Sequence, residues 1–215
     1  MRILAFDASL TGFASAVRRE NGEITLREAA SRTTATAARD RVGRYNDLLN
    51  EVLPAAYLDL EPSGILPTPP IKVDLALIEG YSYASNNPEL YELGILLRAH
   101  LVQSISPQAD IIEVAPMTLK KFCGGHGGAD KVAVASALTK RFGVEFKSSN
   151  ESDAYGLCRL GELIVWVRTP ITDDNQPPAW ATKDQIEIAT RYRDGPIAAK
   201  PAKAKKPRKT KESKE

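Results

Sequence analysis

The sequence predicts an α/β fold in which helices flank a mixed five-stranded sheet. Three observations carry this prediction. The chain opens with three strand-like segments in succession, which favours an antiparallel meander. Strand-like runs then alternate with helical periodicity, a pattern typical of parallel strands joined by crossover helices. The 215 residues are 43% hydrophobic, which is enough for a substantial core.

Apolar runs mark the five expected strands. The first is residues 2–7, and the next two, residues 12–21 and 23–32, meet at an Asn-Gly pair, which is a strong hairpin signal. The fourth run, VDLALIE, ends at Glu79, and the fifth is ADIIEVAP. These runs are short and bounded by turn-forming or charged residues, as buried strands are.

Two helices are expected between these strands. Residues 37–59 have apolar residues at helical spacing, and Pro54 is expected to kink or end this helix. Its apolar face comprises Val42, Tyr45, Leu48, Leu49 and Val52. The second helix follows Asn87 as its N-cap, with Pro88 at its first position.

Further helical segments follow the fifth strand. MTLKKFC is a short helix or turn, and the glycine-rich loop GGHGGADK leads into a helix over residues 131–143. The last long helix covers residues 151–169 and is apolar along one side. With Asn150 as the N-cap of this helix, Asp153 three residues later resembles the second member of a capping pair.

Composition divides the chain into three parts. Residues 1–168 are expected to form one domain, and residues 169–195 a Pro-containing extension. Within the extension, a short helix is predicted over residues 182–193. Thr182 and Gln185 have the spacing of a capping box at its start. Residues 196–215 are expected to be a disordered tail. The last 16 residues contain eight Lys or Arg and two Glu, so their net charge is +6. Because the whole chain has a net charge of +2, the remaining residues carry about −4.

Two apolar strand-like runs end in the same way, each in a carboxylate, Asp7 and Glu79. Ligands bind at the C-terminal ends of strands in open α/β sheets, and if these two strands are parallel neighbours, Asp7 and Glu79 face each other there. Such a pair requires a shared proton or a cation, and hard oxygen ligands favour Mg²⁺ or Mn²⁺. Asp153 is the third candidate, and Glu151 also qualifies. Alternatively, each strand acid meets only water, and capping alone explains Asp153.

Four segments stand in a specific order and spacing: ILAFDASLTGFASAV, LALIEGYSYASNN, VAPMTLKKFCGGHGGADKVAV and NESDAYGL. This set resembles the RuvC-type Holliday junction resolvases of the RNase H-like nuclease superfamily, and is most similar to bacteriophage versions. The first segment resembles the family's first strand, which carries an Asp, and the second resembles its strand with a Glu. The third is similar to the family's lysine-bearing segment with a glycine loop, and the fourth to its terminal acidic helix. The resemblance spans roughly residues 1–168 and implies an RNase H-like (RuvC-type) nuclease domain.

The resemblance implies DNA cleavage with two Mg²⁺ ions per active site, for which Mn²⁺ is a substitute. Asp7, Glu79 and Asp153 match three of the family's metal ligands. The family has Asp or His three residues before its last Asp, where this sequence has Asn150, so the fourth ligand is either Asn150 or Glu151. Lys131 matches the family's acidic-Lys helix start, and it is expected to act in catalysis as a positive charge near the phosphate.

Several segments are expected to contact DNA. The resemblance implies that an aromatic residue soon after Glu79 wedges or stacks at the junction, while one of the two tyrosines there packs against the sheet. Glycines let backbone amides approach a phosphate, and lysines add charge. The tail is expected to bind the DNA backbone without sequence preference. The residues are Tyr81, Tyr83, Lys120, Lys121, Gly125, Gly127, Lys131, Lys205, Lys206, Arg208 and Lys209. The family's upstream lysine matches either Lys120 or Lys121.

The function expected from this resemblance is a Mg-dependent crossover junction endodeoxyribonuclease, which resolves Holliday junctions and other branched DNA. A homodimer is expected, because symmetric cleavage of a four-way junction needs two sites related by a two-fold axis. The apolar helix after Asn87 is the candidate interface. The alternatives are a nuclease that prefers flaps, forks or RNA–DNA hybrids, and a weakly catalytic DNA-structure-binding protein in which Asn150 marks a degraded metal site.

A cytoplasmic location is expected, in the host bacterium if the protein is phage-encoded. Cys123 and Cys158 stand outside any CxxC motif, as is usual in a reducing compartment. Neither a signal peptide nor a membrane span is expected.

Overall fold

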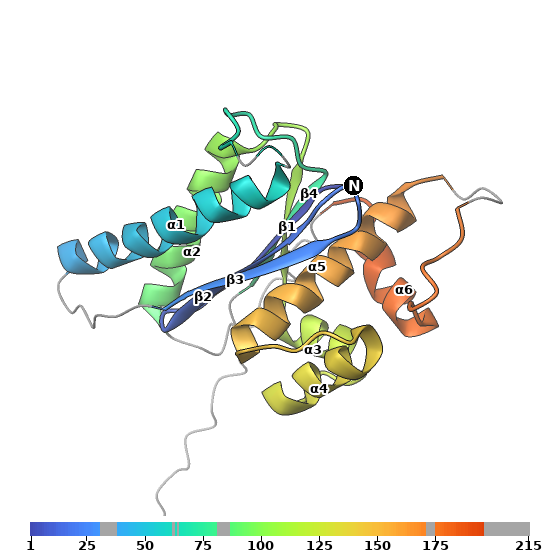
Figure 1. Ribbon diagram of the computed structural model, residues 1–215. Coiled ribbons are helices and arrows are strands. Elements are labelled where there is room, and N and C mark those ends of the chain that lie inside the picture. Colours follow the sequence, from blue (N-terminus) through green and yellow to red (C-terminus); the bar gives the residue numbers. More distant parts are fainter. Residues whose placement is uncertain (31–37, 62, 64, 81–86, 171–174, 196–215) are drawn as a thin grey trace, which may run out of the picture.

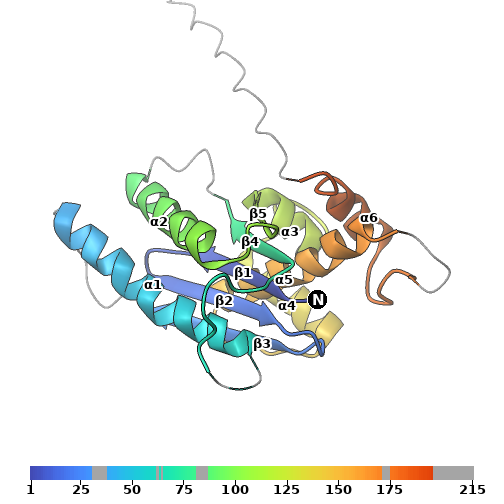
Figure 2. The same cartoon turned by 90° about the horizontal axis from the view of Figure 1, so that it is seen from above.

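The computed structural model describes residues 1–30, 38–61, 63, 65–80, 87–170 and 175–195. A five-stranded sheet forms its centre, with helices on both faces (Figures 1 and 2). The strands are β1 (Ile3–Ala8), β2 (Gly12–Arg18), β3 (Ile24–Ala30), β4 (Leu75–Glu79) and β5 (Asp110–Val114).

The sheet is mixed, as the sequence predicts, and its strand order is β3-β2-β1-β4-β5. β2 is antiparallel to both β1 and β3, whereas β4 is parallel to both β1 and β5. The β2–β3 hairpin turns at Gly22, whose φ of 91° is a conformation that favours glycine. Beside it, the amide of Arg19 donates to the carbonyl of Glu23 over 2.9 Å. The predicted hairpin is therefore confirmed.

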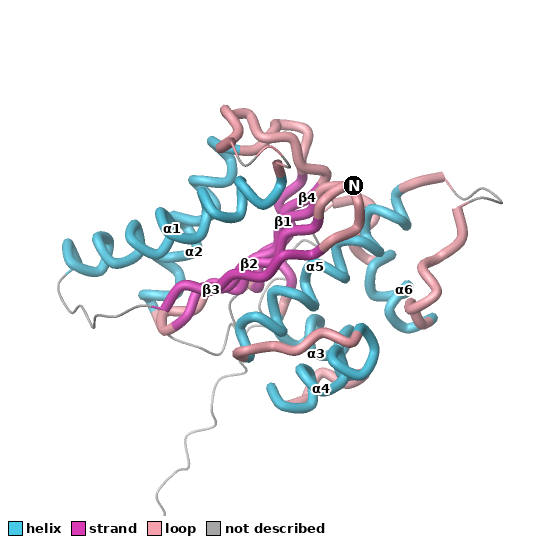
Figure 3. The backbone as a smooth tube through the Cα atoms, in the orientation of Figure 1, coloured by secondary structure: helices cyan, strands magenta, loops and turns pink. Residues whose placement is uncertain are grey.

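The described residues contain six helices, which surround the magenta strands in Figure 3. They are α1 (Ala38–Leu60), α2 (Pro88–Ser104), α3 (Pro116–Gly124), α4 (Lys131–Phe142), α5 (Ser149–Arg168) and α6 (Lys183–Thr190). α1 and α2 cover one face of the sheet, and α5 covers the other, with α3, α4 and α6 packed against α5 (Figure 2). No helix among the described residues is long and apolar enough to cross a membrane.

Side-chain alternation along the strands builds two cores. In β1, Ile3 and Ala5 belong to the core on the α5 side, whereas Leu4 and Phe6 belong to the core under α1 and α2. β4 is likewise buried on both faces up to Ile78. A carboxylate at the end of either strand is therefore held on a rigid, buried backbone.

Two details of α1 differ from the prediction. Pro54 lies inside the helix, which continues to Leu60. The carbonyl that Pro54 leaves without its helical donor belongs to the exposed residue Asn50, so the helix tolerates the loss. Val42, expected on the buried face, is 42% exposed, because the first turns of α1 extend past the edge of the sheet (Figure 1).

The predicted capping box at Thr182 and Gln185 is present at the start of α6. This helix is shorter than the predicted 182–193, and it buries Ile188 and Ala189 in the same core as α5. In addition, the side-chain amide of Gln185 donates to the carbonyl of Phe122 in α3 over 2.8 Å. The described part of the extension thus packs onto the body, while the division of the chain into domains stays a prediction.

Candidate active site

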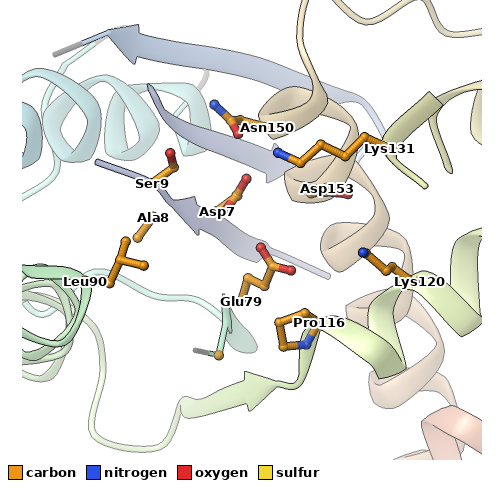
Figure 4. A pocket seen from close by; sticks show the side chains of 11 residues that line it. Asp7, Ala8, Ser9, Glu79, Leu90, Pro116, Lys120, Lys131, Asn150 and Asp153 are labelled. Carbon is orange, nitrogen blue, oxygen red and sulfur yellow. The ribbon is translucent and has the colours of Figure 1, made fainter. Parts of the chain in front are cut away.

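Asp7 and Glu79 lie together at the C-terminal edge of the sheet. β1 and β4 are parallel neighbours, with Phe6 opposite Ile78, so the ends of the two strands meet. Alternation along each strand turns both carboxylates toward α5. There Asp153, in the second turn of α5, joins them (Figure 4). One carboxylate oxygen from each of the three side chains lies within 4.8 Å of the others.

The three carboxylates line a pocket of about 400 Å³. Lys120, Lys131 and Asn150 line it as well, and they come from three different helices (Figure 4). Ala8 and Ser9, which follow Asp7, are small and leave space beside it. The pocket is therefore an anionic cavity with cations at its wall.

The pKa values of all three carboxyl groups are raised. Desolvation is the largest cause for the pKa of Asp7, which lies well above its usual range, and the charge of Glu79 comes next. Desolvation also raises the pKa of Glu79. Desolvation, followed by the charge of Glu79, raises the pKa of Asp153 to about 7. Because the nearby lysines offset these effects only in part, the pocket favours a further cation.

Two of the three candidate lysines reach the pocket. Lys131 begins α4, and its ammonium group donates to the hydroxyl of Ser149 over 3.1 Å. Lys120 lines the pocket from α3, whereas Lys121 is exposed and does not line it. Successive residues on a helix are turned by about 100°, so the two neighbours face different directions. The geometry therefore favours Lys120 over Lys121 beside the carboxylates.

The two candidates for an additional ligand occupy different environments. Ser148 is the N-cap of α5, and its hydroxyl accepts from the amide of Glu151 over 3.1 Å. The carboxylate of Glu151 accepts from the amide of Lys147 over 2.7 Å, so Glu151 is engaged in capping α5 and does not line the pocket. Asn150 lines the pocket from the first turn of α5. The N-cap role that the sequence pattern suggested for Asn150 is wrong, because Ser148 fills it.

The glycine loop has a local structural role. Gly125 ends α3 with a φ of 82°, and its amide donates to the carbonyl of Lys121 over 3.0 Å. A Cβ atom on Gly127 would lie 3.3 Å from the carbonyl oxygen of Met117. Neither glycine lines the carboxylate pocket, and neither does the exposed His126. A contact between this loop and DNA stays a prediction.

Comparison with known proteins adds a likeness to solved structures. No family model and no curated protein matches the sequence. RuvC of Thermus thermophilus is 20% identical, with a TM-score of 0.48, over 74% of this chain and 91% of its own. T. thermophilus RuvC in complex with a Holliday junction substrate is 23% identical, with a TM-score of 0.48, over 74% and 90%.

A viral resolvase is also similar, at a greater distance. The complex of Fowlpox virus resolvase with substrate Holliday junction DNA is 10% identical and has a TM-score of 0.34. The alignment covers 74% of this chain and 95% of the viral chain.

Six of the expected DNA contacts lie outside the described residues. They are Tyr81, Tyr83, Lys205, Lys206, Arg208 and Lys209. They stay predictions.

Sequence reasoning missed two polar residues next to the pocket. Ser149 accepts a hydrogen bond from Lys131, and Glu28 of β3 accepts one from Asn150. The signal for Glu28 is strand register: Asp7 pairs with Ala14, and Ala14 pairs with Glu28, so they form one row across three strands. No local motif marks this residue.

Proposed function

We propose that this protein is a metal-dependent endonuclease that hydrolyses phosphodiester bonds in branched DNA, foremost Holliday junctions. The observation that carries the proposal is the convergence of Asp7, Glu79 and Asp153 within 4.8 Å, with Lys120 and Lys131 at the wall of the same pocket. Such an anionic pocket suits a polyanionic substrate only when cations are added to it. The substrate class rests on the RuvC-type resemblance of the four sequence segments.

The residues of the pocket fit a hard divalent cation. All the ligand atoms that the three side chains offer are carboxylate oxygens, which favour Mg²⁺ or Mn²⁺. Desolvation is the largest cause of the raised pKa of each group, and a cation beside the carboxylates would favour their charged forms. In our proposal the three residues hold two Mg²⁺ ions, for which Mn²⁺ substitutes. When bound, these ions would activate water and offset the charge that develops on the phosphate.

The chain itself supplies charge and space for the phosphate. Lys131 and Lys120 point into the pocket from α4 and α3 (Figure 4), so they add fixed positive charge where negative charge would develop. Ser149 restrains the Lys131 ammonium group. Ala8 and Ser9 leave room for the substrate next to Asp7. The buried strands hold Asp7 and Glu79 in place, which limits reorganisation during the reaction.

A homodimer is part of the proposal, because a four-way junction presents two scissile strands related by a two-fold axis. α2 buries Leu93 and Leu97 against the sheet but exposes Ile95 and Val102, which are 59% and 70% exposed. This exposed apolar face makes α2 the proposed interface.

A cytoplasmic location, in a bacterial host for a phage-encoded protein, completes the proposal. Cys123 and Cys158 are both free and buried, which suits a reducing compartment.

One observation favours a second candidate function. Asn150 is neutral where the resolvases that the sequence resembles carry Asp or His, so the alternative is a weakly catalytic protein that binds branched DNA. A nuclease for flaps, forks or RNA–DNA hybrids is a variant of the first proposal that differs only in its substrate.

Mg²⁺-dependent cleavage of matched junction, flap, fork, hybrid and duplex substrates tests the proposal. Asp7→Asn, Glu79→Gln and Asp153→Asn are each expected to slow junction cleavage by on the order of 10³-fold, because each removes charge that stabilises the transition state through the metal site. Junction binding, measured by gel shift, should persist in all three variants.

The control is Asp47→Asn, which removes an exposed carboxylate from α1 on the other face of the sheet. This variant should cleave like the wild type. Full activity of Glu79→Gln would contradict the proposal. Junction binding without cleavage by the wild type would favour the binding protein.

A further inference from the structure

The side chain of Asn150 is held in one orientation by two acceptors. Its amide nitrogen donates to the carbonyl oxygen of Gly12 over 3.0 Å and to the carboxylate of Glu28 over 2.8 Å. Neither partner atom has a hydrogen to donate, so only the NH₂ end of the amide can satisfy both. The opposite rotamer would place the amide oxygen against two other oxygens. The Oδ1 atom must therefore point away from Glu28.

The oxygen that remains lies on the pocket side. Asn150 is among the residues that line the pocket, and in Figure 4 its oxygen is turned toward Asp7 while its nitrogen is turned away. Asn150 and Asp153 are three residues apart on α5, so both project from the same side of the helix. The amide oxygen thus joins the three carboxylates as a further oxygen donor that carries no charge.

Glu28 reaches Asn150 because of the sheet register. Asp7, Ala14 and Glu28 stand opposite one another on β1, β2 and β3, and directly opposed residues present their side chains on the same face. Two strand spacings separate Glu28 from Asp7, roughly 10 Å. Glu28 is thus placed to hold a side chain that reaches the pocket, rather than to enter the pocket itself.

Gly12 makes the arrangement sterically possible. A Cβ atom at this position would lie 2.6 Å from the amide nitrogen of Asn150 and 2.6 Å from the Oε1 atom of Glu28. Any other residue at position 12 would displace this hydrogen-bonded pair. β2, β3 and α5 therefore each contribute one component of the contact.

We propose that Glu28 is a positioning residue that, together with the Gly12 carbonyl, fixes Asn150 with its oxygen directed at the metal site. This inference rests on the proposed function. It explains how a neutral residue serves at this position: an aspartate there would face two acceptors without a donor, whereas an amide donates to both and still presents an oxygen. Hydrogen-bond partners that orient ligands in this way contribute to metal affinity.

Titration of the full chain with Mn²⁺ alone, followed by electron paramagnetic resonance of the free ion, tests the inference without DNA or cleavage. Glu28→Ala is expected to weaken Mn²⁺ binding on the order of 10-fold. Glu28→Gln should bind nearly as tightly as the wild type, because the glutamine oxygen can still accept from Asn150. The double variant Glu28→Ala with Asn150→Ala should bind no more weakly than Asn150→Ala alone. Glu145→Ala, which removes an exposed carboxylate four residues before α5, is the control for lost charge and should match the wild type.

A second pair of variants, in which donor and acceptor are exchanged, keeps the inference testable if Glu28→Ala does not fold. Asn150→Asp alone should bind Mn²⁺ more weakly than Asn150→Asp combined with Glu28→Gln, since only the glutamine can donate to the new carboxylate. The opposite order would overturn the inference, as would wild-type affinity of a folded Glu28→Ala protein. Asp7→Asn distinguishes failure of the proposed metal site from failure of the role of Glu28. If Asp7→Asn and Glu28→Ala both bind Mn²⁺ like the wild type, the proposed metal site is wrong. If Asp7→Asn loses Mn²⁺ binding and Glu28→Ala does not, only the role of Glu28 is wrong.

Discussion

At the scale of single residues, the site is a group of carboxylates that the protein's own cations do not neutralise. Asp7 is 6% exposed, and Asp153 is 9% exposed. Lys131 and Lys120 lower the pKa of Asp153, yet desolvation and the charge of Glu79 outweigh them. Rigid elements hold all three acids, so they cannot move apart, and repulsion is relieved only by a proton or a cation. The metal-free protein should therefore lose stability when these groups ionise.

The pH dependence of unfolding follows from the sign of this shift. In the unfolded chain Asp153 has its usual pKa of 3.8, and in the folded protein its pKa is about 7. Between these values the folded state binds more protons, so the free energy of unfolding falls as pH rises through the window and levels off above it. We expect urea unfolding in EDTA to show a lower free energy at pH 8 than at pH 5, by on the order of a few kcal/mol.

Asp153→Asn is the matched variant, because it removes the titrating group and keeps the shape of the side chain. Its unfolding free energy should depend less on pH over the same range. Added Mg²⁺ should raise the stability of the wild type at pH 8, since a ligand that binds only the folded state stabilises it. An equally steep decline in Asp153→Asn would show that other groups cause the pH dependence.

At the scale of elements, α5 decides which side chains reach the site. Its first turn carries Asn150 and Glu151, and its second carries Asp153. Residues three apart share a face, whereas the next residue is turned by about 100°. Asn150 and Asp153 therefore both line the pocket, while Glu151 turns back to cap its own helix. The close packing of α5 on the sheet keeps this arrangement in place.

Gly161 permits that close packing. A Cβ atom there would lie 2.6 Å from Leu77 Cδ1 and 3.0 Å from Ile3 Cγ2, both in the core between α5 and the sheet. We expect Gly161→Ala to lower the free energy of unfolding by about 1–3 kcal/mol, because overpacking exceeds the gain in helix propensity. Denaturant unfolding measures the change.

Gly43 is the control glycine, since it lies in α1 and a Cβ atom added there would have no neighbour within 4 Å. Gly43→Ala should stabilise the protein by about 0.5–1 kcal/mol, as expected for an exposed helical site. If both substitutions were stabilising, α5 would not be as closely packed as the structure shows.

Patterns of neighbouring residues in the sequence predicted most of these helices and strands, and the predictions that were wrong have physical reasons. The apolar runs ending at Asp7 and Glu79 were expected to bring these two carboxylates together, because the C-terminal ends of parallel neighbouring strands meet at one edge of a sheet. The start of α5 was misplaced because Ser148 and Asn150 are both good N-cap residues, and only the fold decides between them. Glu28 was missed because its partner lies 122 residues away in sequence. Short-range spacing carries no information about such a contact.

At the scale of the whole molecule, charge is distributed unevenly along the chain. The last 16 residues carry +6, whereas the remainder carries about −4. A net negative body opposes the approach of DNA at low salt, and a basic segment attached to it attracts DNA over about one Debye length. Encounter with DNA and chemistry on DNA should therefore depend on different parts of the chain.

Removal of residues 198–215 should separate these two contributions. All eight cations of the tail are lost, so junction affinity should fall, and the plot of log affinity against log salt should become flatter, since each phosphate contact contributes about 0.9 to the slope. The Mg²⁺-dependent rate at saturating DNA should not change, because the carboxylate pocket remains intact. Replacing Lys205, Lys206, Arg208 and Lys209 by glutamine keeps the chain length and should reproduce part of the effect. An unchanged slope would mean that the cations that contact DNA lie within the body, with Lys120 and Lys131 at the pocket as the first to test.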